Sequence, residues 1–403
     1  MELDSFNLEQ AIESILANGI LSKDQITQLS FLSAARQRIL DHLSLTWQLK
    51  SRTKWALQGD SNTNFFHMVA SGRRTQNMIW SLEDEAGNII DEDGSLKELG
   101  KCFFQNIFTN EGLTCLDQQL NVISLFPRMI PLDHSNCLTT QVTLKEIEHS
   151  LKSFKKDRSP GPDGWPVEFY LHFFDLLGPI LCQLVDSTRI SGFIPSSLNS
   201  TFLTLIPKKD KPRTFADFRP ISLCNLLYKL IAKVIAGRLK PFLDQGISYE
   251  QFGFLKDRQI YEPIGIVQEV LHSIKTKNIC AFILKLDLTK DFDRVDWTFV
   301  RFILIQIGVP LLTVNWIMGC ITTGTSSNFF TASRGIRQGF PLSPLIFILV
   351  IEGLSLLIKD ARSNGLIRGI KLSSSLTLSH LLFVDDAILL SYVISSLMDD
   401  VGL

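Results

Sequence analysis

The chain has 403 residues, and its 40 Lys and Arg against 41 Asp and Glu leave a formal net charge of −1. With 45% hydrophobic and 20% charged residues, the composition is that of a globular protein and excludes a disordered chain. The balanced charge also excludes a uniformly basic nucleic-acid coat protein, so any basic surface must be local. At roughly 150 residues per domain, the length predicts two or three domains.

The cysteines and the apolar segments predict where the chain resides. Seven cysteines occur singly, without the C-x₂-C spacing of a zinc site, which favours reduced thiols in an intracellular protein. Nucleus and cytoplasm are not distinguished. The N-terminus lacks the pattern of a signal peptide. The most apolar stretch, residues 345–358, is shorter than the roughly 20 residues of a membrane span and contains Glu352, so we expect a buried helix and no membrane association.

The N-terminal segment is predicted to be helical. Apolar residues recur at three-to-four spacing in residues 8–21 and again in residues 35–49, as on one face of a helix. A basic and aromatic patch follows between Lys50 and Arg74. Residues 81–95 place a Gly-Asn turn between short apolar pairs, which predicts a β-hairpin.

The middle of the chain is locally basic. Residues 151–260 hold 16 Lys and Arg against 10 Asp and Glu, a net charge of +6, which is typical of a face that binds a polyanion. Prolines and glycines in residues 159–170 predict a fixed turn that leads into a helix. Residues 223–243 carry an apolar stripe and predict one amphipathic helix.

Two acidic segments are candidates for chemistry. A strand pattern runs up to Asp287, and a helix is expected after it. Further on, two apolar runs flank Asp385 and Asp386 in LLFVDDAILL, which predicts a hairpin with two carboxylates at its tip. If this hairpin lies beside the strand that ends at Asp287, three carboxylates converge and suit two divalent cations. The alternative is that all three are ordinary surface-turn aspartates.

These segments, together with SRGIRQGFPLSPLIFILVIEGL (333–354) and FRPISLCNLLYKLIAKVIAGRL (218–239), resemble the reverse transcriptases of LINE-type (non-LTR) retrotransposons, especially those of plants. Residues 55–74 resemble the connector that joins an endonuclease to the polymerase in such elements. Residues 159–170 resemble the opening polymerase motif.

The resemblance implies roles for individual residues. Asp287, Asp385 and Asp386 match the catalytic and metal-binding aspartates, and Phe292 matches the aromatic residue that excludes a ribose 2′-hydroxyl. Arg219 matches a residue that binds the incoming triphosphate. Lys208 is a weaker candidate for that role, since other basic residues between 209 and 213 are equally near. Gln338 and Gly339 match the turn that packs beside the nascent base pair.

The resemblance also implies a fold and a reaction. The expected fold is α+β, a right-hand polymerase with fingers and palm only. We expect a helical connector at 1–80, a linker and pre-finger region at 81–148, fingers at 149–275 and an incomplete palm at 276–403. The implied reaction is RNA-directed DNA synthesis, in which a primer 3′-hydroxyl attacks a dNTP on an RNA template with two Mg²⁺ or Mn²⁺ ions.

The sequence departs from the family at several places. Position 340 is Phe where the family has Asp, position 291 is Asp where it has Ala, and Val384 replaces Ala. A palm stretch near residue 328 is shorter than usual, and no upstream endonuclease or following thumb is recognisable. We therefore expect a decayed reading frame with weak or no processive activity.

Three alternatives remain open. The chain could be a non-catalytic retrotransposon remnant that binds nucleic acid through its basic segments. It could copy DNA rather than RNA, or its palm sheet could serve only as an interaction scaffold.

Overall fold

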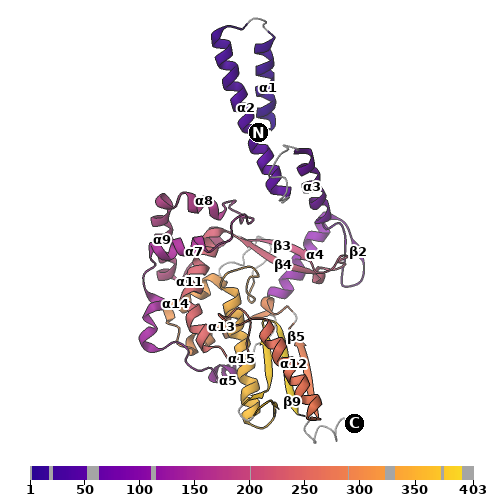
Figure 1. The fold of residues 1–403 in the computed structure, drawn as a ribbon, viewed down its shortest axis with the longest axis vertical. Helices are drawn as coiled ribbons and strands as arrows, with labels where there is room; N and C mark the ends of the chain where they lie inside the picture. Colours follow the sequence, from indigo (N-terminus) through magenta and orange to yellow (C-terminus); the bar gives the residue numbers. More distant parts are fainter. Residues whose placement is uncertain are drawn as a thin grey trace. The chain divides into compact units, whose positions relative to one another are not determined.

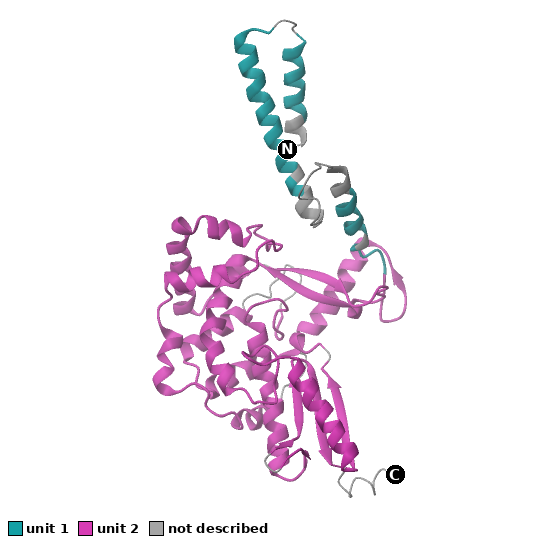
Figure 2. Ribbon diagram, in the orientation of Figure 1, with its two compact units in different colours: residues 1–81 teal, residues 82–403 magenta. Residues whose placement is uncertain are grey.

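A computed structural model describes residues 2–17, 21–51, 63–109, 115–199, 201–288, 290–322, 332–373 and 376–392. The chain divides into two compact units, residues 1–81 and residues 82–403 (Figure 2). Each unit is described by itself.

The first unit is helical. Its helices are α1 (Glu2–Leu16), α2 (Lys23–Ser51) and α3 (Thr63–Gln76). The two segments with helical periodicity lie largely in α1 and α2, so this prediction is confirmed. An ion pair of 2.6 Å between the Arg36 guanidinium and the Glu9 carboxylate joins α1 to α2. Residues 52–62 of the basic and aromatic patch lie outside the described residues.

The second unit begins with the predicted hairpin. Strands β1 (Leu82–Glu83) and β2 (Ile89–Ile90) pair antiparallel. The Asp84 carboxylate closes the turn, because it accepts hydrogen bonds from the amides of Ala86 and Asn88 at 2.9 and 2.8 Å. The described part of this unit also contains a longer two-stranded ribbon, β3 (Thr201–Pro207) with β4 (Phe218–Cys224), and a short pair, β6 (Ile370–Lys371) with β7 (Thr377–Leu378).

The sheet that carries the acidic segments has the strand order β5-β9-β8. Its members are β5 (Ala281–Asp287), β8 (His380–Phe383) and β9 (Asp386–Tyr392). All neighbours are antiparallel, and the register places Asp287 directly opposite Asp386. The hairpin and its position beside the earlier strand are therefore confirmed. Helix α12 (Tyr261–Thr276) lies beside this sheet (Figure 1).

The core of the second unit is helical. Helix α11 (Leu226–Gly246) buries the predicted apolar stripe and begins three residues later than expected, because residues 218–224 pair with β3. Helix α15 (Ser343–Ser363) contains the apolar stretch and is buried as predicted. Glu352 within it is 1% exposed and accepts hydrogen bonds from the amide and hydroxyl of Ser248. Among the described helices, none is long and apolar enough to cross a membrane.

Further helices surround these two (Figure 1). They are α4 (Asp93–Phe108), α5 (Leu116–Ser124), α6 (Asn136–Thr139), α7 (Leu144–Lys152), α8 (Val167–His172), α9 (Phe174–Ser191), α10 (Ser196–Asn199), α13 (Trp297–Gln306) and α14 (Leu311–Thr322). The described residues also form the short 3₁₀ turns η2 (Leu132–His134), η3 (Phe215–Asp217) and η4 (Phe292–Arg294). Helix α8 begins inside the segment 159–170, where a turn leading into a helix was expected, and α13 is the helix expected after Asp287.

Candidate active site

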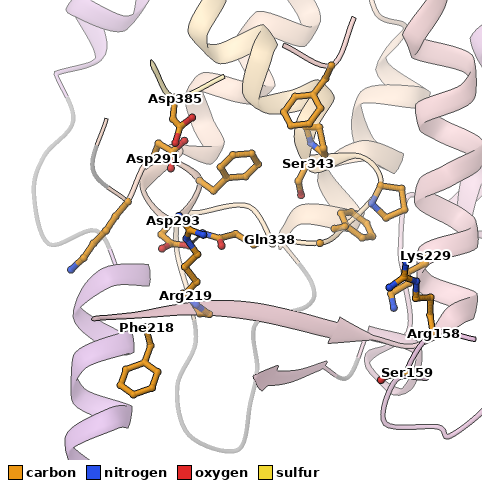
Figure 3. Close-up of a pocket in the computed structure, with 18 of the residues that line it drawn as sticks. Arg158, Ser159, Phe218, Arg219, Lys229, Asp291, Asp293, Gln338, Ser343 and Asp385 are labelled. Carbon is orange, nitrogen blue, oxygen red and sulfur yellow. Dashed lines mark hydrogen bonds between the residues drawn. The ribbon is translucent and has the colours of Figure 1, made fainter. Parts of the chain in front are cut away.

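A cavity of about 930 Å³ opens within the second unit between the β3–β4 ribbon, the end of β5 and the start of α15. Asp287 and Asp385 line it, as do Phe292, Arg219 and Gln338. The carboxylates of Asp385 and Asp291 lie close together at one end, and Arg158 and Lys229 lie at the other end (Figure 3). The cavity therefore has an acidic end and a basic end.

Backbone geometry brings the acidic residues together. Asp287 is the last residue of β5, and Asp385 lies in the tight turn between β8 and β9. The amide of Leu288 donates to the carbonyl of Asp385 at 3.3 Å, which joins the end of β5 to this turn. The two carboxylates come from positions about 100 residues apart and share one cavity wall.

Asp386 was expected to join Asp287 and Asp385, but it does not line the cavity. Its carboxylate forms an ion pair of 2.9 Å with the ammonium of Lys285. Cross-strand partners, and residues two apart along a strand, share a face of a sheet. Lys285 therefore projects on the same side as Asp287 and Asp386, within reach of both. The pKa of Lys285 is raised by Asp386 and, more weakly, by Asp287 and Asp385.

The metal-binding role of the three aspartates stays a prediction. Among the described residues, no three His, Cys, Asp or Glu side chains are grouped closely enough to hold a metal ion. Two of the predicted aspartates face the cavity, and the third is neutralised by a lysine that the sequence analysis did not single out.

Two further carboxylates stand in the cavity wall. Within the described part of the chain, Oδ2 of Asp291 is buried and has no hydrogen-bond partner. Burial raises the pKa of Asp291, and the charges of Asp385 and Asp287 raise it further. Asp293 is 4% exposed, and burial together with the charge of Asp291 raises its pKa to about 6. Sequence reasoning noted Asp291 and missed Asp293, although its spacing of two from Asp291 on a short turn was a signal.

Phe292, the aromatic residue of the site, packs against the helical core. Phe292 lies in η4 and stacks on Phe347 of α15, with ring centroids 4.4 Å apart and an interplanar angle of 17°. Its carbonyl accepts a hydrogen bond from the amide of Ile336 at 2.8 Å. The ring therefore forms a fixed part of the cavity wall.

The turn at 338–340 packs against β4. The carbonyl of Gln338 accepts from the amide of Ser222 at 3.1 Å, and the Gln338 amide group makes a long contact of 3.5 Å with Oδ1 of Asp293. Gly339 has a φ of 90°, a left-handed conformation that glycine adopts without strain. Phe340 is buried and stacks on Tyr228 at 4.6 Å, so the unusual aromatic residue fits the surrounding core.

The structure separates the basic candidates. Arg219 is an exposed residue of β4 that lines the cavity, and Lys208 lines it too while donating to the carbonyl of Ala216 at 2.9 Å. Lys209 instead pairs with Asp217 at 2.9 Å. Hydrogen bonds, first from the Arg213 amide and then from Lys209, lower the pKa of Asp217 to about 2. Lys208 is therefore the better placed of these lysines for a ligand in the cavity.

Comparison with known proteins agrees with this arrangement. Residues 206–401 match the family described as "Reverse transcriptase (RNA-dependent DNA polymerase)". The chain is 27% identical over 366 residues to "Transposon TX1 uncharacterized 149 kDa protein" of Xenopus laevis, which covers 86% of this chain and 27% of the relative. It is 29% identical over 236 residues to the "Retrovirus-related Pol polyprotein from type-2 retrotransposable element R2DM" of Drosophila melanogaster, covering 56% of this chain and 22% of the relative.

Residues 206–401 form a reverse transcriptase domain of the non-LTR retrotransposon type. The chain as a whole spans about a quarter of the length of these two relatives. A third relative, "Uncharacterized mitochondrial protein AtMg01250" of Arabidopsis thaliana, is 48% identical over 67 residues, which are 16% of this chain and 55% of that protein. The match implies the polymerase-like fold of reverse transcriptases for these residues, and the matched family is one of RNA-dependent DNA polymerases, a class that generally uses divalent metal ions.

Proposed function

We propose that the cavity is the nucleotidyl-transfer site of this reverse transcriptase domain. In this proposal the β3–β4 ribbon and its neighbouring helices act as fingers, and the β5-β9-β8 sheet acts as the palm. The observation that carries the proposal is the register that sets Asp287 beside the 385–386 turn, in a cavity that also contains Phe292 and Arg219. The substrates would be a primer 3′-hydroxyl, a dNTP and an RNA template.

The acidic end of the cavity offers carboxylate oxygens, the ligand type that Mg²⁺ and Mn²⁺ prefer. Asp287 and Asp385 line it, and a buried Asp291 oxygen there has no hydrogen-bond partner among the described residues. Asp287 and Asp385 would hold two Mg²⁺ or Mn²⁺ ions, and Asp386 would join them once its ion pair with Lys285 opens. When bound, such ions stabilise the negative charge that develops on the transferred phosphate and align the attacking hydroxyl.

The remaining residues would bind and select the nucleotide. Arg219 and Lys208 offer positive charge to the triphosphate from the β3–β4 ribbon, and a guanidinium can donate two parallel hydrogen bonds to phosphate oxygens. Phe292 would exclude a ribose 2′-hydroxyl by steric clash, because its ring is held against Phe347. Gln338 and the exposed backbone at Gly339 would pack beside the nascent base pair. We also propose an intracellular location, which the free thiols of all seven cysteines support.

Primer extension tests this function. The full chain is incubated with poly(rA)/oligo(dT) and dTTP, in Mg²⁺ and separately in Mn²⁺, beside an Asp385→Ala variant. We expect short products from the wild-type chain and none from the variant. Long products would overturn the expectation of decayed activity, and products that persist in the variant would overturn the proposed site.

The basic end of the cavity favours a second candidate, RNA binding without catalysis. Arg158 and Lys229 lie there, away from the carboxylates (Figure 3). For this candidate, filter binding of RNA should weaken steeply with salt and remain unchanged in Asp287→Ala, because phosphate contacts release counterions and do not involve the carboxylates. A wild-type chain that binds RNA in this manner and makes no product in either metal would establish this candidate over polymerase activity.

A further inference from the structure

The turn that carries Asp385 has an unusual backbone. Val384, the residue before Asp385, has a φ of 57°. This left-handed conformation is unfavourable for a β-branched residue and persists only where the surroundings hold it. What holds Val384 therefore also sets the direction in which Asp385 and Asp386 project.

Residues 250–252, about 130 residues earlier in the sequence, fix the backbone around Val384. Residues 250–252 run parallel to β8: the amide of Leu382 donates to the carbonyl of Glu250 at 2.8 Å, and the amide of Phe252 donates to the carbonyl of Leu382 at 2.9 Å. The side chain of Gln251 is fully buried. Its Oε1 accepts hydrogen bonds from two amides, those of Gly253 at 2.9 Å and Val384 at 3.4 Å.

Gly253 allows this close packing against Val384 because it has no side chain. A Cβ added to Gly253 would lie 2.6 Å from Cγ2 of Val384 and 3.0 Å from its backbone nitrogen. Carbon atoms do not approach to 2.6 Å without displacement. Only glycine at position 253 therefore lets this segment approach the 384–385 turn so closely.

The segment is itself anchored. The Arg258 guanidinium donates to the carbonyls of Ile247, Ser248 and Gln251. The Glu250 carboxylate pairs with Lys359 of α15 at 2.8 Å. The segment is thus fixed to the helical core on one side and to the hairpin on the other.

We propose that Gln251 and Gly253 are positioning residues, which hold Val384 in its left-handed turn and so aim Asp385 into the cavity. This inference rests on the proposed function of the cavity. Asp385 lines the cavity, but Gln251 and Gly253 do not. Both act through the backbone of Val384.

The close approach gives a direct test by second-site suppression. Gly253→Ala should push Val384 and the turn aside and weaken Mn²⁺ binding, measured by the electron paramagnetic resonance of free Mn²⁺, by about tenfold or more, because small displacements of a catalytic group are costly. Val384→Ala removes Cγ2, so the Gly253→Ala/Val384→Ala double variant should bind Mn²⁺ within about threefold of Val384→Ala alone. Gly265→Ala is the matched control, since no described atom lies within 4 Å of a Cβ built there.

The hydrogen bond is tested separately. Gln251→Met keeps the shape of the side chain and removes the acceptor, and it should raise amide hydrogen exchange in residues 380–392 and lower kcat for primer extension more than it changes KM for dTTP. Gln268→Met, at an exposed position of α12, is its control. Circular dichroism and unfolding midpoints close to wild type are required of each variant, and Gln251→Asn replaces Gln251→Met if the latter does not fold.

The outcomes separate the two proposals. A wild-type chain that makes no product refutes the proposed function, whereas Mn²⁺ binding and hydrogen exchange still judge the hold on Val384. Unchanged Mn²⁺ binding in Gly253→Ala, or a double variant as weak as Gly253→Ala, would overturn the positioning role.

Discussion

Asp293 provides a quantitative test of the electrostatics in the cavity wall. Its carboxyl is 4% exposed, and burial is the main cause that raises its pKa from 3.8 to about 6, with the charge of Asp291 adding to it. The substitution Asp293→Asn keeps the size of the side chain and an oxygen that can accept from Gln338, but it carries no charge at any pH.

The direction and size of the effect follow from the two pKa values. Because the folded-state pKa lies above the unfolded value, the folded chain binds this proton more tightly. The contribution is complete below about pH 4 and is lost as the pH rises through about 6. A difference of about two pH units corresponds to about 3 kcal/mol. The ionised carboxylate thus lowers the free energy of unfolding by about 3 kcal/mol at neutral pH, and Asp293→Asn should restore much of it.

Urea unfolding in the presence of EDTA measures this difference. Because the unfolded carboxyl is already largely ionised at pH 5, about half of this difference is present there. Between pH 5 and pH 8 the stability of Asp293→Asn relative to wild type should therefore rise by about 1.4 kcal/mol. Asp210→Asn, at an exposed position, is the matched control and should show no such trend. Glu352, whose pKa burial raises to about 7, also makes wild-type stability fall with pH, so only the difference between variants is informative. A stability difference that does not change with pH would refute the reasoning.

Three other substitutions test the remaining parts of the site. Phe292→Ala should raise ribonucleotide relative to deoxyribonucleotide incorporation by at least about tenfold in competitive primer extension, because the ring no longer blocks the 2′ position; an unchanged ratio would contradict the selective role. Lys285→Ala should tighten Mn²⁺ binding, measured by the electron paramagnetic resonance of free Mn²⁺, because the ammonium no longer competes for Asp386. Weaker binding would show that Lys285 supports the site. Phe340→Ala should lower the free energy of urea unfolding by about 3–5 kcal/mol, because it removes a buried ring stacked on Tyr228; a loss below about 1 kcal/mol would mean that the stack contributes little.

The parts of the site that could be predicted from the sequence depend on local patterns. Apolar runs on both sides of Asp385 and Asp386 define a hairpin, and the strand pattern before Asp287 ends at the carboxylate itself. The resemblance to a known family then implied that the two segments pair, and the register confirms this. The buried helix at 345–358 was predictable for the same reason, since its length and composition are local properties.

The parts that could not be predicted depend on which distant side chains meet. Nothing near Asp386 in the sequence shows that Lys285 neutralises it, because that ion pair depends on the register between two strands about 100 residues apart. The hold of Gln251 on Val384 spans more than 130 residues. Similarly, four basic residues between 208 and 213 looked alike until η3 supplied Asp217 as the partner of Lys209.

Phe340 shows how a departure from the family can fit the core and still alter the site. Its ring stacks on one aromatic neighbour, Tyr228, over which the Arg337 guanidinium also lies, at 4.7 Å. One end of that guanidinium donates to Asn199, while Nη2 is buried without a hydrogen-bond partner among the described residues. An aromatic ring fills the space of a side chain but accepts no strong hydrogen bond, which the aspartate of the family could do at this position. We therefore expect the loss of activity to come from a changed position of the 337–340 turn, while the aspartates at the acidic end of the cavity remain in place.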